Sequence, residues 1–332
     1  MADLAEDVPS IEIYSIDEAF CDFTGIADPK ALATHLRHKV WRNQRIPMGV
    51  SVAPTKTLSK LGQYATKKIS RLQGVCVLAE PSQWQWLAAR TPVSEVWGVG
   101  RRLTIKLEAM GVDTALDLAN LNFSAARDVA GVTLERTVRE LQGVACIDIE
   151  LMPTNKQQII SSRSFGSKVT TLPPLLQAVS AHAERAAEKL RHQQSYAGRL
   201  SVSIQTGHFI KSPLLESHSV SIAGGTDDPR RLSFEAVDIA RRLFRPGVAY
   251  AKAGVILLDI RPINCWQGDL LEPNSLQDNA ELLMAIDKIK QRFGSRSIKL
   301  ARQGSEALWA MKREMLSPNY LGDLSQAVTI KC

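Results

Sequence analysis

The apolar pattern between residues 159 and 260 alternates between strand and helix periods. Strand-like stretches occupy 159–165, 199–206, 216–222 and 255–260, and amphipathic helical stretches occupy 175–192 and 229–244. The resulting order, β-α-β-β-α-β, is typical of a split βαβ domain, in which helices cover one face of a sheet. The sequence therefore predicts an α+β domain in the second half of the chain.

The first half of the chain combines a short α+β pattern with a helical one. A strand-like run at 11–24 predicts a hairpin, and a helix at 29–42, a strand at 48–53, a basic helix at 57–69 and a strand at 74–78 follow. Glycine and proline break residues 81–143 into short helices with little β signal, which predicts a separate all-helical module. A polar, proline-containing linker at 151–157 then precedes the split βαβ pattern. We therefore expect a multidomain α+β protein.

Charge and composition narrow the class of partner. The formal net charge of +7 suits a polyanion, because lysine and arginine neutralise phosphates and release counterions. No apolar run is long enough to span a membrane, and the acidic start is unlike a secretory signal. The five cysteines are scattered without metal-ligand spacing, which argues against a disulfide framework or a zinc site. These features predict a cytoplasmic protein with a polyanionic partner, and they leave ribosomal, membrane-surface and nucleic-acid partners open.

Two adjacent carboxylates, Asp17 and Glu18, lie at the tip of the expected hairpin. Neighbouring acids can share two divalent cations about 3.5 to 4 Å apart, the arrangement used for in-line phosphoryl transfer. For an isolated Asp-Glu pair a solvated turn is the better explanation, since acidic residues are ordinary in turns. The lysines downstream add context, because Lys56, Lys60 and Lys67 follow a Pro-Thr turn and can meet a triphosphate. Their alternative is a solvated basic face.

A glycine-rich turn precedes one of the helices of the helical region. The sequence Val96-Trp97-Gly98-Val99-Gly100 precedes a helix at 101–110, and it resembles a helix-hairpin-helix motif. Glycines let such a turn approach a phosphate while the helix N-terminus offers free N–H groups. A helix packing joint without a ligand is the alternative. We expect DNA-backbone contact from a set of six residues: Gly98, Val99, Gly100, Arg101, Arg102 and Lys106.

Two further stretches carry candidate binding residues. Ser162, Arg163 and Ser164 lie at the end of the first strand of the split βαβ pattern, where their donors suit phosphate oxygens or simply line a polar edge strand. In the polar stretch after the last strand, Gln267, Leu270 and Leu271 belong to a pentapeptide that fits a docking peptide, although loops contain such sequences by chance.

Several stretches together resemble the Y-family DNA polymerases. They are Tyr14 to Phe20 (Tyr-Ser-Ile-Asp-Glu-Ala-Phe), Gly49 to Lys60, the glycine turn, and the tail Met311 to Pro318, which is similar to the end of UmuC-type polymerases. The resemblance implies a partial palm at 1–80, a helical thumb with a helix-hairpin-helix at 81–150, a little finger at 151–262 and a C-terminal extension at 263–332.

The same resemblance implies roles and partners. Asp17 and Glu18 correspond to palm ligands of Mg²⁺, Lys67 to a lysine on the incoming triphosphate, and the peptide at 267–271 to a sliding-clamp ligand. Primer-template and damaged DNA, deoxynucleoside triphosphates, a UmuD-type accessory dimer and a recombinase filament are the implied partners, and SOS translesion synthesis is the implied function.

The family also places a strand with another metal-binding aspartate, a fingers domain and a steric-gate aromatic before this hairpin, which here begins at Ile11. Asp3, Glu6 and Asp7 do not match that strand. We therefore expect an N-terminally truncated polymerase with an incomplete metal site and an incomplete palm sheet, and little activity from the chain alone. The alternative function is a catalytically silent fragment that binds DNA and docks on the clamp; a helix-hairpin-helix nuclease is disfavoured, because it too needs a complete acidic site.

Overall fold

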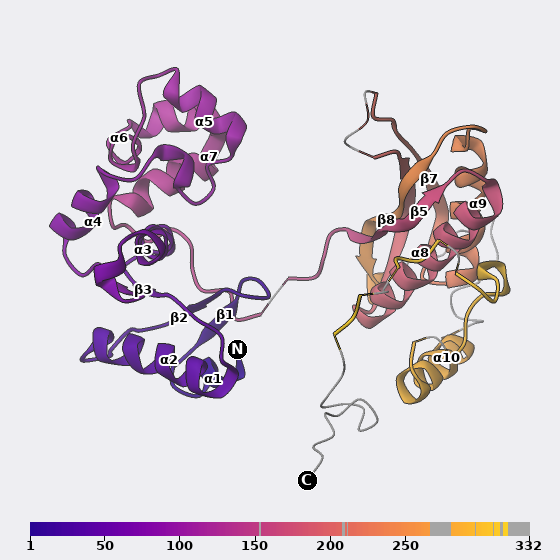
Figure 1. The fold of residues 1–332 in the computed structure, drawn as a ribbon, viewed down its shortest axis with the longest axis horizontal. Helices are drawn as coiled ribbons and strands as arrows, with labels where there is room; N and C mark the ends of the chain where they lie inside the picture. Colours follow the sequence, from indigo (N-terminus) through magenta and orange to yellow (C-terminus); the bar gives the residue numbers. More distant parts are fainter. Residues whose placement is uncertain are drawn as a thin grey trace, which may run out of the picture. The chain divides into compact units, whose positions relative to one another are not determined.

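A computed structural model describes residues 1–152, 154–207, 210, 212–265, 280–295, 297–307, 309–312 and 315–317. The chain divides into an N-terminal unit, Met1–Pro153, and a C-terminal unit, Thr154–Cys332 (Figure 1). The boundary falls within the linker expected at 151–157. None of the described helices is long and apolar enough to cross a membrane.

Two small sheets and two helices form the first part of the N-terminal unit, after a short helix α1 (Ala2–Ala5). Strands β1 (Ile11–Ile13) and β2 (Ala19–Cys21) pair antiparallel, as the sequence predicted for this hairpin. Strands β3 (Val50–Val52) and β4 (Val75–Val77) pair parallel. The remaining elements are α2 (Pro29–Gln44), α3 (Lys56–Lys68) and η1 (Ser70–Leu72).

Helix α3 begins where the sequence places a hydroxyl. The Thr55 side chain accepts a hydrogen bond from the Leu58 N–H, which caps the helix and fixes the start of its lysine row. Gly62 then lets α3 pack closely on β3, since a Cβ at this position would lie 2.0 Å from Ser51 Oγ. Capping and close packing together fix α3 on the sheet.

Short helices form the second part of the N-terminal unit: α4 (Pro81–Ala88), η2 (Val93–Glu95), α5 (Arg101–Glu108), α6 (Ala115–Ala119) and α7 (Phe123–Leu141). The sequence led us to expect a separate module, but one core joins these helices to α3 and β4. Leu58 and Leu61 of α3 are buried in the same cluster as Leu107, Leu118 and Val138. The apolar face of α3, opposite its lysines, explains this continuity.

The C-terminal unit is built on an antiparallel sheet in the order β5-β8-β6-β7. The elements in chain order are β5 (Ile159–Val169), α8 (Leu172–His192), β6 (Ser195–Gln205), β7 (Leu215–Thr226), α9 (Pro229–Leu243), β8 (Tyr250–Pro262), η3 (Ile263–Cys265), α10 (Ala280–Phe293) and η4 (Ala301–Gln303). Because β8 pairs antiparallel with both neighbours, β5 and β6 run parallel with β8 between them.

Helices α8 and α9 cover one face of this sheet (Figure 1). Their apolar faces meet alternate residues of the strands, including Leu200, Val202, Val255 and Leu257, each at most 1% exposed. Alternation along a strand leaves the residues between them on the other face. Among the described residues, no helix of the core covers this second face of the sheet.

Candidate functional site

Asp17 and Glu18 lie in the turn between β1 and β2, as the sequence predicted. The Ser15 hydroxyl donates to Asp17 Oδ1 at 2.5 Å, and this bond lowers the pKa of the Asp17 carboxyl, with smaller contributions from the charges of Lys67 and Lys60. Asp17 is therefore held ionised in a turn that two lysines of α3 face. An ionised, exposed carboxylate is suited to accept a cation.

Lys60 meets the hairpin directly. Its ammonium lies 2.8 Å from Glu18 Oε2 and 4.5 Å from the centre of the Tyr14 ring. Phe20 and Trp97 present their rings to the same ammonium at 5.4 and 5.9 Å. The aromatic faces and the carboxylate both favour a cation here, so Lys60 is fixed beside the acidic pair.

Lys56 lies in different surroundings from the other two lysines. It is 8% exposed, it forms an ion pair with Glu12 of β1, and it donates to the Asp148 carbonyl at 2.7 Å. Glu12 also accepts the Glu150 N–H at 2.7 Å. The Lys56 ammonium is thus occupied in joining β1 to α3 and to the segment after α7, whereas Lys67 is exposed on the same helix.

An aromatic cluster connects the hairpin to the glycine turn. The rings of Tyr14, Phe20 and Trp97 have centroid separations of 5.6 to 5.7 Å, and the Trp97 indole N–H donates to the Tyr14 hydroxyl at 3.2 Å. Trp97 belongs to the turn whose glycines the sequence singled out. The structure therefore brings the predicted metal residues and the predicted phosphate-binding turn to neighbouring places in one unit.

Glu140 is a buried carboxylate that sequence reasoning missed. It is 0% exposed and accepts from the Thr57 N–H at 2.9 Å, the Thr57 hydroxyl at 2.7 Å, and the N–H groups of Cys146 and Ile147 at 3.1 and 3.0 Å. Its own carbonyl accepts the Thr55 hydroxyl. Glu140 thus holds the first turn of α3, and with it the lysine row, on α7. The sequence gives no periodic signal for this contact, because the partners are 83 residues apart.

The glycine turn has the backbone geometry that its sequence indicates. Gly98 has φ 90°, in the left-handed region that glycine favours, and Gly100 caps α5. Within the described chain, the N–H groups of Arg101 and Arg102 have no backbone acceptor. These side chains and Lys106 are exposed, while Val99 is buried at 8%. The turn therefore offers N–H donors and cations on its outer side and is anchored by Val99 on its inner side.

A second turn of the same kind interrupts α7, and sequence reasoning missed it. Gly131 has φ 74° within Val129-Ala130-Gly131-Val132, which repeats the Val-x-Gly-Val spacing of residues 96–99. Each glycine is followed 12 or 13 residues later by a Gly-Val pair, at Gly111 and Gly143, again with positive φ. This internal repeat was present in the sequence and is the signal that would have found the second turn.

The C-terminal unit separates the three candidate residues of β5. Ser161 is buried and its hydroxyl lies 3.3 Å from His182 Nδ1 of α8, so odd-numbered β5 residues, Arg163 among them, lie on the helix side. Ser162 and Ser164 lie on the face that no core helix covers. Arg163 and Ser164 are exposed, and Ser162 is half-buried.

Strand register reveals more hydroxyls on that uncovered face. Ser162 pairs with Gly254, Gly254 with Ser203, and Ser203 with Ser217, so small residues form one row across all four strands. The neighbouring rows add further serines: Ser164, Ser201, Ser219 and Ser221. Side chains this short leave the face flat and rich in hydrogen-bond donors. These serines are far apart in the sequence and only strand pairing brings them together, so the sequence alone did not predict this set.

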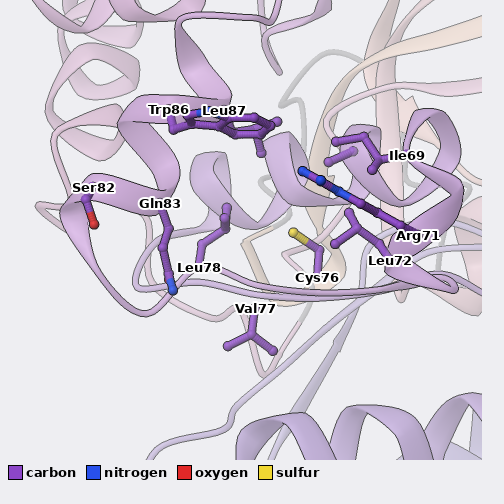
Figure 2. Close-up of a pocket in the computed structure, with 11 residues that line it drawn as sticks. Ile69, Arg71, Leu72, Cys76, Val77, Leu78, Ser82, Gln83, Trp86 and Leu87 are labelled. Atoms are coloured by element: carbon purple, nitrogen blue, oxygen red, sulfur yellow. The ribbon is translucent and has the colours of Figure 1, made fainter.

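A pocket of about 390 Å³ lies elsewhere in the N-terminal unit (Figure 2). It is lined by α3, η1, β4 and α4, with Cys76, Leu78 and Trp86 among the residues around it. None of Asp17, Glu18 and the three candidate lysines lines it. Ala65 and Ile69 face it from the side of α3 opposite the lysine row, so the pocket is separate from the hairpin site.

Comparison with known proteins decides the family. Residues 1–63 match the impB/mucB/samB family, 156–270 match the impB/mucB/samB family C-terminal domain, and 280–330 match a domain of unknown function. The chain is 40% identical to Protein UmuC of Salmonella typhimurium, over 100% of this chain and 80% of that protein. It is 41% identical to Protein ImpB of Salmonella typhimurium (96% and 77%) and 40% identical to Protein MucB of Escherichia coli (94% and 75%). The chain belongs to the impB/mucB/samB family.

The fold agrees with this family. A Y-family DNA polymerase chimera of Dbh and Dpo4 superimposes with a TM-score of 0.59 at 18% identity, over 78% of this chain and 73% of that one. The mixed helix-and-sheet fold is thus that of the Y-family polymerases. Gln267, Leu270 and Leu271 lie outside the described residues.

Polymerases of this family use divalent metal ions, and Asp17 and Glu18 have the right donors for one. Both are carboxylates, and the lowered pKa of Asp17 keeps it charged. Within the described part of the chain, no three side chains of His, Cys, Asp and Glu gather as a metal site. The two residues therefore fit as part of a ligand set, and they need further ligands to hold two ions.

Proposed function

We propose that this chain performs error-prone translesion DNA synthesis over the tip of the β1–β2 hairpin. Membership of the impB/mucB/samB family makes it, by family, a DNA-directed DNA polymerase of the UmuC type. The observation that carries the proposal is the grouping of Asp17 and Glu18 with Lys60 and Lys67, acids for a cation and bases for a triphosphate in one place.

Each residue of this group has its own task. Asp17 and Glu18 hold Mg²⁺, which supplies charge neutralisation during phosphoryl transfer when it is bound. Lys67, exposed near Asp17, meets the triphosphate, and Lys60 joins it when nucleotide arrives and replaces Glu18 as its anionic partner. Lys56 positions the group through its ion pair with Glu12, since its ammonium is already occupied.

Two surfaces hold the DNA. In the N-terminal unit, the glycine turn at 98–100 presents N–H groups to the backbone, and Arg101, Arg102 and Lys106 add charge. In the C-terminal unit, Ser162, Ser164 and the serine row of the uncovered sheet face donate to phosphates, and Arg163 contributes from the strand edge. Both modes are independent of base identity. Binding is therefore tolerant of sequence and weakens steeply with salt.

We assign residues 1–80 to a palm, 81–150 to a thumb with a helix-hairpin-helix, 151–262 to a little finger and 263–332 to a C-terminal extension. The positive φ of Gly98 supports the helix-hairpin-helix, and the parallel β5 and β6 around β8 support the split βαβ form of the little finger. Docking of Gln267, Leu270 and Leu271 on a sliding clamp, and contacts with a UmuD-type dimer and a recombinase filament, remain predictions from the resemblance. Replacing Leu270 and Leu271 with alanine is expected to abolish capture by the clamp.

Primer extension by the purified chain on a template with an abasic site tests the proposal. Because Asp17 and Glu18 need further ligands to hold two ions, we expect only weak extension with Mg²⁺ and nucleotides. The pair Asp17→Ala and Glu18→Ala should remove that extension, while Asp113→Ala, an exposed carboxylate elsewhere in the unit, should leave it unchanged. DNA binding is measured beside it by fluorescence anisotropy. Extension that persists without both carboxylates contradicts the proposed site, and binding without any extension favours the silent DNA-binding alternative.

A further inference from the structure

Residues that match the domain of unknown function pack against the sheet domain of the same unit. Asp287 of α10 accepts two hydrogen bonds from Arg191 of α8, both at 2.7 Å. Lys290 forms an ion pair with Glu184 at 2.6 Å, and both side chains are at most 10% exposed. The buried Lys290–Glu184 pair holds a specific arrangement, because separating one partner leaves the other charge unpaired. The segment is therefore docked in a fixed position on α8.

The chain then reaches β5 through Trp309. Its ring lies 5.6 Å from His182 of α8 and 6.5 Å from Phe165 of β5, and it packs against the main core of the unit. Its backbone carbonyl accepts the Gly166 N–H at 3.3 Å. Both an aromatic contact and a backbone hydrogen bond thus fasten residues 309–312 to the edge strand.

Gly166 is the position that permits this approach. Strand β5 pairs with β8 as far as Ser164 and again at Val169, so Gly166 lies in the irregular interval between them. A Cβ on Gly166 would lie 2.4 Å from the Ala310 carbonyl oxygen and 2.8 Å from the Lys312 nitrogen. Both are backbone atoms of the docked segment, so any side chain here would displace it.

Docking places an additional cation on the strand that carries the candidate DNA contacts. Lys312 is exposed, and its Cγ lies 3.1 Å from the position of a Cβ on Gly166. Arg163 and Lys168 are exposed on either side of Gly166 along β5. At about 3.3 Å per residue, those two lie roughly 16 Å apart along β5. Lys312 lies beside the strand between them, at Gly166.

We propose that Lys312 is a phosphate contact of the β5 DNA surface, and that Trp309 and Gly166 position it. The domain of unknown function thereby completes a nucleic-acid surface whose other residues belong to the sheet. This inference rests on the proposed binding of DNA by β5. The opposite arrangement, in which residues 309–312 cover β5 and exclude DNA, is an outcome of the same test.

The test measures the affinity of the full chain for primer-template DNA by fluorescence anisotropy at several NaCl concentrations. Lys312→Gln is compared with Lys288→Gln, which removes the same charge from an exposed position on α10. Gly166→Ala is compared with Gly207→Ala, where a Cβ meets nothing within 4 Å. Hydrogen exchange of residues 309–312 reports whether the segment is still docked. Arg163→Gln monitors the proposed β5 surface independently.

We expect Lys312→Gln to weaken binding by about 3- to 10-fold and to reduce the slope of log affinity against log salt by about 0.9, the share of one phosphate contact. Gly166→Ala should raise exchange in 309–312 and weaken binding equally, and the double variant should bind no worse than either. Equal affinity for Lys312→Gln and Lys288→Gln overturns the inference, as does tighter binding by Gly166→Ala. If Arg163→Gln also leaves binding unchanged, the proposed β5 surface itself fails; if it weakens binding while Lys312→Gln does not, only the role of Lys312 fails.

Discussion

Each strand of the N-terminal unit has three residues, whereas the strands of the four-stranded sheet have 11 to 13. The long strands are held by an apolar core of α8, α9 and the sheet. The short ones carry the candidate active site, and buried or half-buried polar groups hold them: Glu12, Lys56, Lys60 and Glu140. The first unit also has an apolar core, around α3 and the helices α4 to α7, but the segments that carry its candidate active site are joined to that core by polar groups that also position chemistry.

The largest effect that separates the two units is expected from Glu140→Ala. Loss of this carboxylate leaves the buried Thr57 donors and the half-buried Cys146 and Ile147 N–H groups without an acceptor, which costs about 3 kcal/mol of unfolding free energy. Hydrogen exchange should show faster opening of α3 and unchanged protection of α8. Glu140→Gln, which keeps an acceptor, should cost less. Equal loss of protection in α8 would contradict the separation of the two units.

The stability of the C-terminal unit is expected to depend on pH through His182. Burial, aided by the charges of Arg163, Arg185 and Lys189, lowers the pKa of its imidazole to about 4. In the unfolded chain this imidazole has a pKa near 6.5, so it binds a proton there before it does in the folded chain. The contribution of neutral His182 to the free energy of unfolding is therefore fully present above about pH 6.5 and is lost as the pH falls toward 4. The loss from this group is at most about 3 kcal/mol.

Unfolding of the C-terminal unit followed between pH 4 and 7 checks this expectation. In His182→Gln the dependence should be flatter than in the parent chain, whereas His192→Gln, an exposed change on the same helix, should keep the parent slope. Identical slopes in the parent and His182→Gln would mean that other groups govern the acid sensitivity of this unit.

A smaller and more specific effect is expected at the glycine turn. Gly98 and Gly247 have φ 90° and 82°, and at neither does a Cβ meet an atom closer than 3.9 Å. Alanine should strain each by about 1 kcal/mol and destabilise only its own unit. Gly98→Ala should also weaken DNA binding severalfold, because the turn must present the N–H groups of α5 to the backbone. An equal loss of affinity in Gly247→Ala would refute the role of the turn.

Local sequence patterns predicted the helices and strands of each unit, but they did not predict the contacts between residues that are distant in the sequence. Hydrophobic period, glycine turns and the Asp-Glu pair are properties of neighbouring residues. They therefore predicted the hairpin, α3, α5 and the order of strands and helices in the C-terminal unit. Strands β5 and β8 are longer than expected: β5 continues to Val169 and β8 begins at Tyr250. Their extensions contain small residues such as Gly166, Ala251 and Ala253, which give little strand signal.

Most of what the sequence did not predict depends on pairing across the fold. The serine row needs the register of four strands, and the occupied state of Lys56 needs Glu12 and the Asp148 carbonyl, which come from two other segments. The sequence did not predict the core that α3 shares with α4 to α7. Helix α3 is basic on one face, and the shared core depends on the apolar face opposite. The repeat of Val-x-Gly-Val, in contrast, is a local signal in the sequence itself.

The smallest expected effect tests whether the hairpin and the glycine turn act together. Trp97→Phe removes the donor to the Tyr14 hydroxyl and keeps an aromatic ring beside Lys60; Tyr14→Phe removes the acceptor. Each change should cost about 0.5 kcal/mol in the protection of β1 and β2 against exchange, and the double variant should cost no more than one of them, because the two share a single hydrogen bond. Additive losses would show that the aromatic rings alone join the hairpin to the turn. Non-additive losses would mean that the hydrogen bond itself holds the hairpin in position against the turn. In that case Trp97→Phe should lower primer extension severalfold while DNA affinity stays normal, and this result would connect the turn to the carboxylates.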